Sequence, residues 1–450
     1  MQEENSISFL LERFDAHQHE ESIIWNDKSF SYQWLMERVV FFEEYISQND
    51  IAEGTVVALK GDFTPNSIAL FLALVKKNAI VVPLVATVKN EEELVTISGA
   101  GAVFTIDQND ECSVVKNGRQ ATHAFYDIIR DRRHPGLVLF SSGTSGEPKC
   151  AVHDFAKLLD KFRTKRTALR TLNFLLFDHW GGLNTMLHIL SNGGVVISTK
   201  DRSPANICRL IERYKIELLP ASPTFLNLLL LSEAYNEFDL GSLKIISYGT
   251  EPMLPSTLRR LKELFPNVKL QQTYGLIELG VLRSKSESDE SLWVKLGGDG
   301  YELRVVDGLL EIKAASAMLG YLNAPSPFTE DGWFKTGDAV EVNGAYFRIL
   351  GRKSELINVG GEKVYPSEIE TVIQEMPNIA EVMVYGEKSP ITGMIVVARV
   401  RLFEEEDRKD LASRVKKHCR QVLAPYKIPV KIVVDNEVQY GDRLKKTRVS

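Results

Sequence analysis

The sequence predicts an α/β protein, with a large amino-terminal α/β domain that carries a β-rich annex and a small α+β domain at the carboxyl end. Three observations support this fold class. Apolar runs typical of buried strands alternate with amphipathic helix-like segments from residue 55 onward, which is the rhythm of parallel α/β units. Short strands with glycine turns at residues 297–322 predict the annex. Helix and strand then alternate on a smaller scale from Gly351.

In chain order, strands are expected at residues 56–61, 79–86 and 102–107, with helices at 66–78 and 91–101 between them. The alternation returns as a strand at 193–198, a helix at 203–214 and strands at 216–222 and 244–249. A later helix at 365–376 has Ser367 and Glu370 at the spacing of a capping box. The first domain is expected to cover residues 1–351 and the second residues 352–450, without a long linker.

Composition and charge restrict the partners. The 450-residue chain has a net charge of −6, which leaves no overall basic field for nucleic acid or anionic lipid. The amino terminus lacks a basic stretch followed by an apolar core, and the apolar runs are too short for a membrane span. The four cysteines have no CxxC spacing, so neither a disulfide framework nor a structural zinc site is expected. A cytoplasmic protein with reduced thiols, no nucleic-acid partner and no membrane span is predicted.

The stretch LFSSGTSGEPK, from Leu139 to Lys149, is the most informative in the chain. A strand-like apolar run leads into a loop of small residues, namely Ser141, Ser142, Gly143, Thr144, Ser145 and Gly146. Glycines let the backbone approach an anion, N–H and hydroxyl groups can donate to its oxygens, and Lys149 supplies a positive charge. The spacing is not that of a Walker loop, and a polar surface loop is the alternative. A phosphate-binding loop is therefore predicted.

Further motifs follow this loop in order: YGTEP at 248–252, QTYGLIE at 272–278, DGWFKTGD at 331–338, GRKSELINVGGEKVYPSEIE at 351–370 and LKKTR at 444–448. Together they resemble the signatures of the adenylate-forming enzymes, the superfamily of acyl-CoA and aryl-CoA ligases, carrier-loading adenylation domains and beetle luciferases. The resemblance covers nearly the whole chain. It implies a two-step reaction that uses ATP and Mg²⁺. A carboxylic acid attacks the α-phosphate to give an acyl-adenylate and pyrophosphate, and a thiol then displaces AMP to give a thioester.

The resemblance also implies which residues bind ATP. The loop from Ser141 to Lys149 would wrap the β- and γ-phosphates, and Glu278 would be the Mg²⁺ ligand, since hard cations prefer carboxylate oxygen. Asp338 would accept both ribose hydroxyls, and Arg352 would lie at the joint between the domains, near ribose or phosphate. The adenine would be enclosed by Gly249, Thr250, Glu251 and Tyr274. Each of these residues, considered singly, has an ordinary structural role as the alternative.

Lys445 stands three residues before Arg448 and matches the superfamily's catalytic lysine, which would bridge the attacking carboxylate and the α-phosphate. The glycine usual before that lysine is here Leu444, so Lys446 remains a substitute. His179, in LLFDHWGGLN, would be a second catalytic residue at the mouth of the acyl pocket, with a buried structural histidine as the equal alternative. Ile277 replaces a threonine that donates to the α-phosphate in relatives, which predicts slower adenylation.

CoA is the thiol expected first. The small domain would rotate between the half-reactions, and Gly360 and Gly361 would then admit a narrow pantetheine arm; otherwise they form a plain turn. The phosphopantetheine of a carrier protein is the alternative acceptor. We expect that carrier to be a separate protein, because no carrier sequence is found after Lys445. A nucleotide-binding protein that has lost catalysis is a third alternative, and a homodimer is a possible assembly. The acid is not identified, although Trp180, Tyr248 and Leu276 suggest a pocket with bulky walls.

Overall fold

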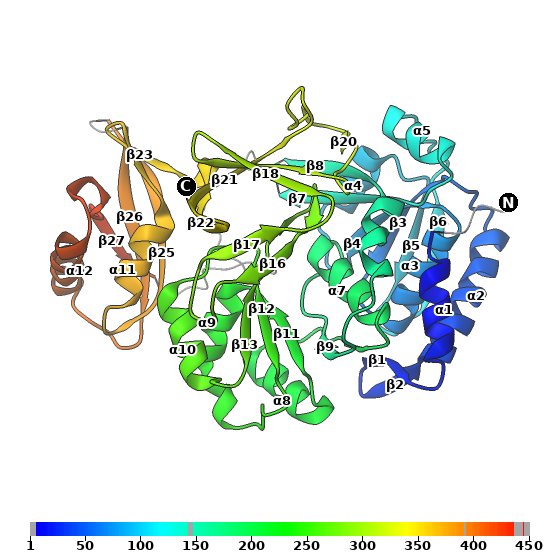
Figure 1. Ribbon diagram of the computed structural model, residues 1–450, viewed down its shortest axis with the longest axis horizontal. Helices are drawn as coiled ribbons and strands as arrows, with labels where there is room; N and C mark the ends of the chain where they lie inside the picture. Colours follow the sequence, from blue (N-terminus) through cyan, green and yellow to red (C-terminus); the bar gives the residue numbers. More distant parts are fainter. Residues whose placement is uncertain (1–5, 143–146, 391–392, 436–443, 445–450) are drawn as a thin grey trace.

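The computed structural model describes residues 6–142, 147–390, 393–435 and 444 (Figure 1). Within these residues the strands form two seven-stranded sheets, an annex sheet of six strands, a two-stranded ribbon and a five-stranded sheet near the carboxyl end. In Figure 1 the five-stranded sheet and its helices lie at one end of the long axis, and the annex lies above the second large sheet, between the five-stranded sheet and the first large sheet. The predicted fold class is confirmed.

The first large sheet has the strand order β20-β8-β7-β4-β3-β5-β6. Its central strands β3, β4, β5 and β7 run parallel, as the alternation of strands and helices predicts. Its strands are β3 (Val56–Gly61), β4 (Ile80–Val85), β5 (Ala102–Ile106), β6 (Cys112–Lys116), β7 (Gly136–Ser142), β8 (Pro148–Asp154) and β20 (Gly320–Tyr321), and the helices of this region are α2 (Tyr32–Gln48), α3 (Pro65–Lys76), α4 (Glu91–Ser98) and α5 (Ala124–Asp131).

The second large sheet has the order β13-β12-β11-β9-β10-β1-β2, and all its neighbours except β1 and β2 run parallel. Its strands are β1 (Glu21–Trp25), β2 (Lys28–Ser31), β9 (Arg170–Leu172), β10 (Val195–Ile197), β11 (Leu218–Ala221), β12 (Ile245–Tyr248) and β13 (Lys269–Gln272). The accompanying helices are α1 (Ser8–Ala16), α6 (Phe155–Leu159), α7 (Trp180–Leu190), α8 (Pro204–Tyr214), α9 (Pro223–Ser232) and α10 (Pro255–Leu264), with 3₁₀ turns η1 (Asp160–Arg163) and η2 (Ala234–Asn236).

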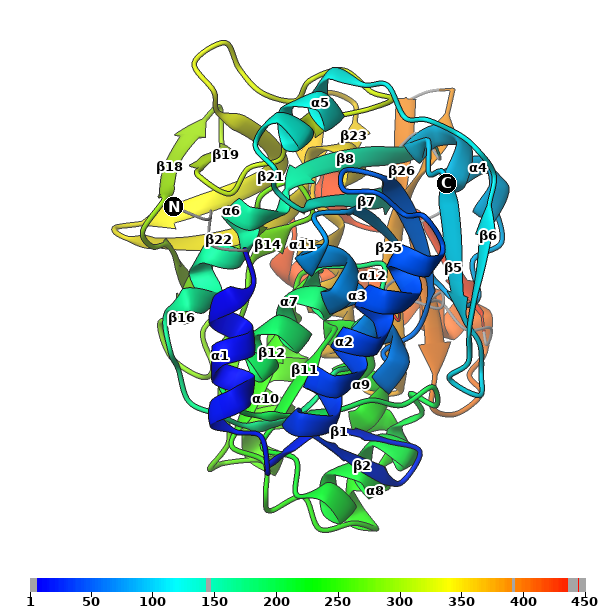
Figure 2. The same ribbon diagram turned by 90° about the vertical axis from the view of Figure 1, so that its right-hand side faces the viewer.

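Helices packed between the two large sheets form the main core. Helix α3 is buried on every side from Ser67 to Val75, as expected for a helix whose surface is apolar all round. Its side chains share one cluster with Val57 and Leu139 of the first sheet and Val196 of the second. Figure 2 shows α2, α3 and α7 stacked in this region. This core fixes the positions of the strand ends that carry the candidate site.

The annex is an antiparallel sheet with the order β16-β17-β22-β21-β19-β18. Its strands are β16 (Arg283–Ser286), β17 (Val294–Gly297), β18 (Tyr301–Val306), β19 (Leu309–Ala314), β21 (Phe334–Asn343) and β22 (Tyr346–Arg352), and the ribbon β14 (Gly275–Leu276) and β15 (Gly280–Val281) precedes it. The annex packs through its own cluster, which includes Leu310, Ile312 and Phe334 together with Tyr274 and Ala151 of the neighbouring segments. The predicted β-rich character of this region is confirmed.

The carboxy-terminal sheet contains β23 (Ile357–Val359), β24 (Glu362–Val364), β25 (Ile379–Ser389), β26 (Gly393–Leu402) and β27 (Lys431–Val434), with helices α11 (Pro366–Gln374) and α12 (Arg408–Val422) and 3₁₀ turns η3 (Lys353–Glu355) and η4 (Pro425–Lys427). Alternate residues of β25 and β26, such as Val384 and Ala398, share one cluster with Ile369 of α11 and Leu411 of α12. Since side chains alternate across a sheet, both helices cover the same face. The boundary between residues 351 and 352 stays a prediction.

The predicted capping box is wrong. Helix α11 begins at Pro366, and no side chain caps its first turn. Ser367 instead donates to the carbonyl of Leu350 at 2.6 Å, and Glu370 accepts the backbone N–H of Val384 at 2.9 Å. Both side chains therefore join the helix to neighbouring strands.

Among the residues that the structure describes, no helix combines the length and apolar character that crossing a bilayer requires. All four cysteines are unbridged, and Cys150, Cys208 and Cys419 are buried.

Candidate nucleotide and acid site

Tyr274, Asp338 and Arg352 meet in one polar group, in which the tyrosine and the aspartate are buried and the arginine is partly exposed. Tyr274 follows β13, and Asp338 of β21 is paired in register with Arg352 of β22. The phenol of Tyr274 donates to Oδ2 of Asp338 at 2.6 Å, and Nε of Arg352 lies 3.4 Å from Oδ1. Burial raises the pKa of Asp338, while the charge of Arg352 and the tyrosine hydrogen bond oppose that rise. A carboxylate has about four acceptor positions, so Asp338 retains capacity for further donors.

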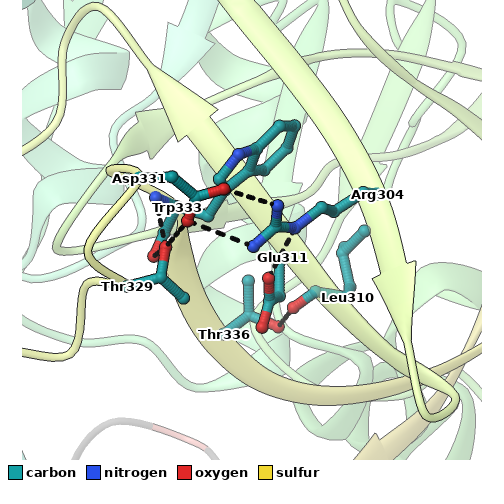
Figure 3. Close-up of polar contacts among 7 residues, drawn as sticks. All are labelled: Arg304, Leu310, Glu311, Thr329, Asp331, Trp333 and Thr336. Atoms are coloured by element: carbon teal, nitrogen blue, oxygen red, sulfur yellow. Dashed lines mark hydrogen bonds and ion pairs between the residues drawn. The ribbon is translucent and has the colours of Figure 1, made fainter.

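A network in the annex holds the turn that precedes Asp338 (Figure 3). Arg304 lies between two carboxylates: its Nε donates to Glu311 at 2.7 Å, and its Nη1 donates to Asp331 at 2.8 Å. Its guanidinium carbon also lies 4.4 Å from the centre of the Trp333 ring. Guanidinium groups pair with carboxylates and stack on aromatic faces at the same time. The first residues of the DGWFKTGD motif are thereby tied to β18 and β19.

Thr336 completes the support of the same motif. Its hydroxyl donates to the carbonyl of Leu310 at 2.7 Å and accepts the backbone N–H of Asp338 at 3.0 Å (Figure 3 shows the Leu310 bond). Between them Gly337 has a φ of 74°, a left-handed conformation that glycine adopts without steric cost. The threonine and the glycine together direct Asp338 toward Tyr274.

Glu278 and Lys149 both contact Tyr321 of β20. The hydroxyl of Tyr321 donates to Oε1 of Glu278 at 2.5 Å, and Nζ of Lys149 lies 5.6 Å from the centre of the tyrosine ring. Burial, followed by the negative charge of Glu278, raises the pKa of Tyr321, so its hydroxyl keeps its proton at neutral pH. The lysine of the predicted phosphate loop and the predicted metal ligand therefore lie on either side of one side chain.

The charge of Arg352 links the two groups. Burial by itself would lower the pKa of Arg352, but the carboxylates of Asp338 and Glu278 raise it above its ordinary value. The same guanidinium opposes the rise in the pKa of Tyr321. Tyr274 and Tyr321, whose hydroxyls donate to Asp338 and Glu278, also belong to one cluster of buried side chains. Lys149, Glu278, Asp338 and Arg352, which are far apart in sequence, thus belong to one charged site.

The predicted phosphate loop joins the ends of β7 and β8. Ser141 lies opposite Lys149 and Ser142 lies opposite Pro148 in this antiparallel pair. The loop begins at the carboxyl end of β7, which is the edge of an α/β sheet where ligands bind. Gly143, Thr144, Ser145 and Gly146 lie outside the described residues, as does the side chain of Ser142.

The second sheet contributes aligned strand ends, since Ala221 of β11, Tyr248 of β12 and Gln272 of β13 lie side by side in register. Gly249 follows β12 directly and has no space for a side chain, because a Cβ there would lie 2.5 Å from Oγ1 of Thr273 and 2.6 Å from its carbonyl oxygen. Gly249 therefore allows the strand that precedes Tyr274 to approach β12 closely.

Thr250 and Glu251 continue from Gly249. Thr250 has a φ of 75°, a strained conformation for a β-branched residue. Oε1 of Glu251 accepts the backbone N–H of Thr224 at 2.8 Å, in the first turn of α9. A carboxylate at this position satisfies an otherwise unpaired helix N–H and complements the helix dipole. Glu251 thus caps helix α9, and its predicted place beside adenine stays a prediction.

Leu444 docks on the amino-terminal domain. The hydroxyl of the fully buried Ser222, directly after β11, donates to its carbonyl at 2.6 Å, and its side chain packs against the cluster beneath the second sheet. Leu444 has a φ of 48°, in the left-handed region that favours glycine. The backbone therefore has a conformation that suits glycine at this position, although the residue here is leucine. Lys445 lies outside the described residues and is the next residue in the sequence.

His179 precedes helix α7 as its N-cap. Nδ1 of the ring accepts the backbone N–H of Gly181 at 3.0 Å, so the neutral ring carries its proton on Nε2. Gly182 permits a close turn, since a Cβ there would lie 2.2 Å from the carbonyl oxygen of Leu176. The capping bond is a structural role for this histidine. Its catalytic role stays a prediction.

Gly360 and Gly361 form the turn between β23 and β24, with φ of 60° and 97°. Positive φ at both central residues is typical of a type I′ hairpin. No atom of the described residues lies within 4 Å of a Cβ built at either position. The plain turn accounts for both glycines, and a passage for pantetheine stays a prediction.

The pocket walls suggested by the sequence are largely core residues. Trp180 and Tyr248 are each about 1% exposed, and Trp180 packs edge-on against Phe155 at 6.2 Å. Ile277 is partly buried and packs against the cores of both the first sheet and the annex. The isoleucine that replaces the usual threonine therefore contributes packing in place of a hydrogen bond.

Sequence reasoning missed three supporting residues, namely Tyr321, Ser222 and Thr336. Tyr321 is part of GYLNAP, a pattern that predicts only a strand and a turn. Ser222 precedes a proline, a pattern that predicts only a helix cap. Thr336 lies within a motif that the sequence did single out. Their contacts are with residues distant in the chain, so spacing alone gives no signal for them.

The donors present fit Mg²⁺ bound together with a nucleotide. Among the described residues, no three His, Cys, Asp or Glu side chains gather closely enough to hold a metal by themselves. Mg²⁺ is commonly held by one or two carboxylates together with substrate phosphates and water. Glu278, fixed by Tyr321 and close to Lys149, is a suitable carboxylate for that arrangement.

A mainly parallel sheet, with the predicted phosphate loop at its edge and the partly buried Lys149 beside it, is consistent with a nucleotide-dependent enzyme of the adenylate-forming class. Comparison with known proteins agrees. The AMP-binding enzyme family matches residues 11–321, and the AMP-binding enzyme C-terminal domain matches residues 368–449. The chain therefore belongs to the AMP-binding enzyme family of the adenylate-forming superfamily and is an AMP-forming ligase.

Individual relatives extend over much of the chain. Acyl-CoA synthetase 7 of Caenorhabditis elegans is 26% identical and covers 93% of this chain and 90% of its own length. Indoleacetate–CoA ligase of Aromatoleum aromaticum is 29% identical over 68% of this chain and 64% of its own length. Two solved structures share the fold, with coverage of at least 95% of both chains in each case: the anthranilate CoA ligase AuaEII with anthranoyl-AMP (TM-score 0.83, 19% identity) and the amide bond synthetase McbA of Marinactinospora thermotolerans (TM-score 0.80, 20% identity).

Proposed function

We propose that this protein activates a carboxylic acid with ATP and transfers the acyl group to the thiol of CoA. The observation that supports this most directly is the single charged site in which Lys149, Glu278, Arg352 and Asp338 converge. Leu444, the residue before Lys445 in the sequence, is bound to Ser222 at the end of β11. The relatives named as CoA ligases and synthetases support CoA as the acceptor.

In the first step ATP binds with its ribose hydroxyls donating to Asp338 and its outer phosphates against the loop and Lys149. The acid's carboxylate oxygen forms a bond to the α-phosphorus, the bridging P–O bond breaks, and pyrophosphate leaves. Lys445 supplies a positive charge between the attacking carboxylate and the α-phosphate. Glu278 would hold Mg²⁺, which would supply charge neutralisation for the phosphates.

In the second step the thiol sulfur bonds to the acyl carbon and gives up its proton to water, and the bond between the acyl carbon and the phosphate oxygen breaks to release AMP. His179 lies at the start of α7, where the ligase resemblance places the arriving thiol. While Nδ1 accepts the backbone N–H of Gly181, that nitrogen cannot take the thiol proton. We infer that His179 would act as a base through Nδ1 only if this capping bond opens.

Pyrophosphate release with a panel of carboxylic acids tests the proposal. Acid-dependent release, followed by thioester formation with CoA, is the expected result. Thioester formation only with a pantetheinylated carrier protein, or amide formation only with an amine, would assign a different acceptor to the same first step. ATP binding with no acid-dependent release across the panel would favour a nucleotide-binding protein that has lost catalysis.

A further inference from the structure

Residues 316–321, which run from the annex into β20 of the first large sheet, hold the turn that carries Glu278. The backbone N–H of Met318 donates to the carbonyl of Glu278 at 2.8 Å, and Oγ of Ser316 donates to the carbonyl of Leu279 at 2.8 Å. The hydroxyl of Tyr321 then reaches the side chain of Glu278 at 2.5 Å. Backbone and side chain of the predicted metal ligand are thus both held by residues 316–321.

The segment that follows, up to Asn323, is hydrogen-bonded to strand β8 on both sides of Lys149. Strand β20 pairs with β8, and the side-chain amide of Asn323 spans the lysine: its Nδ2 donates to the carbonyl of Pro148 at 2.8 Å, and its Oδ1 accepts the N–H of Cys150 at 2.9 Å. The backbone N–H of Leu322 also donates to the carbonyl of Cys150 at 2.9 Å. Residues 316–323 therefore form a brace between the two sides of the phosphate site.

We propose that Tyr321 is a positioning residue for the metal, in that it orients the Glu278 carboxylate for Mg²⁺ bound with ATP and sets its separation from Lys149. This inference rests on the proposed function. One carboxylate oxygen accepts the tyrosine hydrogen bond, which leaves the other for the cation. The tyrosine ring faces the ammonium of Lys149, where a cation is attracted to an aromatic face. Tyr321 is 9% exposed and anchored in β20.

The physical reason is orientation. A glutamate side chain has three rotatable bonds, and freezing them costs free energy when the metal binds. A hydrogen bond made beforehand removes part of that cost, and outer partners of metal ligands commonly change metal affinity by about 10- to 100-fold. Tyr321 acts through Glu278 and makes no bond to a reacting atom.

Tyr321→Phe tests the proposal, because it removes only the hydroxyl. Mn²⁺ binding, followed by electron paramagnetic resonance in the presence of ATP, is expected to weaken by about 10-fold, whereas ATP binding in EDTA should be unchanged. The matched control is Tyr214→Phe, which removes a tyrosine hydroxyl that donates to a different carboxylate, that of Asp27 beside β1. This variant should leave the Mn²⁺ affinity unchanged.

A double-mutant cycle with Glu278→Gln separates positioning from general damage. If Tyr321 acts through Glu278, its substitution should change Mn²⁺ affinity much less in the Glu278→Gln background. Unchanged Mn²⁺ affinity in Tyr321→Phe, an equal loss of ATP affinity in EDTA, or additive effects in the cycle would each overturn the inference. Failure of the wild-type protein to bind ATP at all would instead count against the proposed function.

Discussion

The hydroxyl of Tyr274 lies 2.6 Å from Oδ2 of Asp338 and donates its hydrogen bond to a carboxylate that is only 6% exposed. The two residues come from motifs more than sixty positions apart, and the annex network around Arg304 and Thr336 brings them together. The bond and the nearby Arg352 offset part of the cost of burying the charge. A buried carboxylate kept at such a cost is typical of a binding residue.

Asp338→Asn should separate binding from stability. We expect ATP affinity, measured by titration calorimetry, to fall by roughly 10- to 100-fold, because hydrogen bonds to a charged acceptor are the strongest ones lost. The melting temperature at neutral pH should stay the same or rise, since a buried amide costs less than a buried carboxylate.

The pH dependence of that melting temperature has a defined sign. Burial raises the pKa of Asp338 in the folded protein, so the folded state resists ionisation that the unfolded chain accepts. Wild-type stability should therefore fall relative to Asp338→Asn as the pH rises above the ordinary aspartate range, about 4. A variant less stable than wild type above that range, with ATP affinity intact, would contradict both expectations.

Lys445→Ala should abolish ATP–pyrophosphate exchange while sparing transfer from a supplied acyl-adenylate to the thiol. The lysine is needed only where charge develops at the α-phosphate. Rapid-quench measurements of the two half-reactions give the test, with Lys446→Ala as the matched control. Equal loss of both half-reactions in Lys445→Ala, or a larger loss in Lys446→Ala, would show that the assignment is wrong.

Leu444→Gly should lower the rate of adenylation by roughly fivefold, because the half-buried side chain contributes about 1 kcal/mol of packing against the second sheet. The left-handed φ of 48° suits glycine, so any loss comes from packing and not from backbone strain. Leu444→Met, which keeps an apolar chain of similar size, is the control. Identical exchange rates in all three proteins would rule out an anchoring role for this residue.

Ile277→Thr should raise the rate of adenylation by about tenfold through a new hydroxyl donor near the α-phosphate. It should also lower the free energy of unfolding by about 1 kcal/mol, because Ile277 packs against two cores. Ile277→Val loses packing without gaining a hydroxyl, so it should show the stability loss alone. A fall in the adenylation rate of the threonine variant would refute the hypothesis.

His153 should make stability sensitive to acid. It is fully buried, and burial lowers its pKa from 6.5 to about 4. Below pH 6.5 the unfolded chain takes up a proton that the folded state refuses, so stability falls as the pH drops toward 4, by up to about 3 kcal/mol. Denaturant unfolding of His153→Leu should flatten this dependence. The control is His19→Gln, because His19 is exposed, and this variant should keep the pH dependence of the wild type. A similar flattening in His19→Gln would argue against the assignment to His153.

Much of the fold could be predicted because it depends on local periodicity. The strand at 56–61, the apolar helix that follows it and the helix at 203–214 all appear as β3, α3 and α8. The capping box could not be judged from spacing, because Ser367 bonds to the carbonyl of Leu350 and Glu370 accepts the N–H of Val384. Neither partner lies in the helix. The sequence suggested Trp180 and Tyr248 as pocket walls, but in the structure both side chains are buried in the core.

The amino-acid sequence by itself determined the class of protein, and it predicted a reaction and a set of charged site residues, since motif order and residue chemistry are read directly along the chain. Only the tertiary structure decided how those residues are held. The bond from Tyr321 to Glu278, the clasp of Ser222 on Leu444 and the network that aims Asp338 at Tyr274 all join segments that are remote in sequence. Such contacts arise from packing and strand register, which no local pattern encodes.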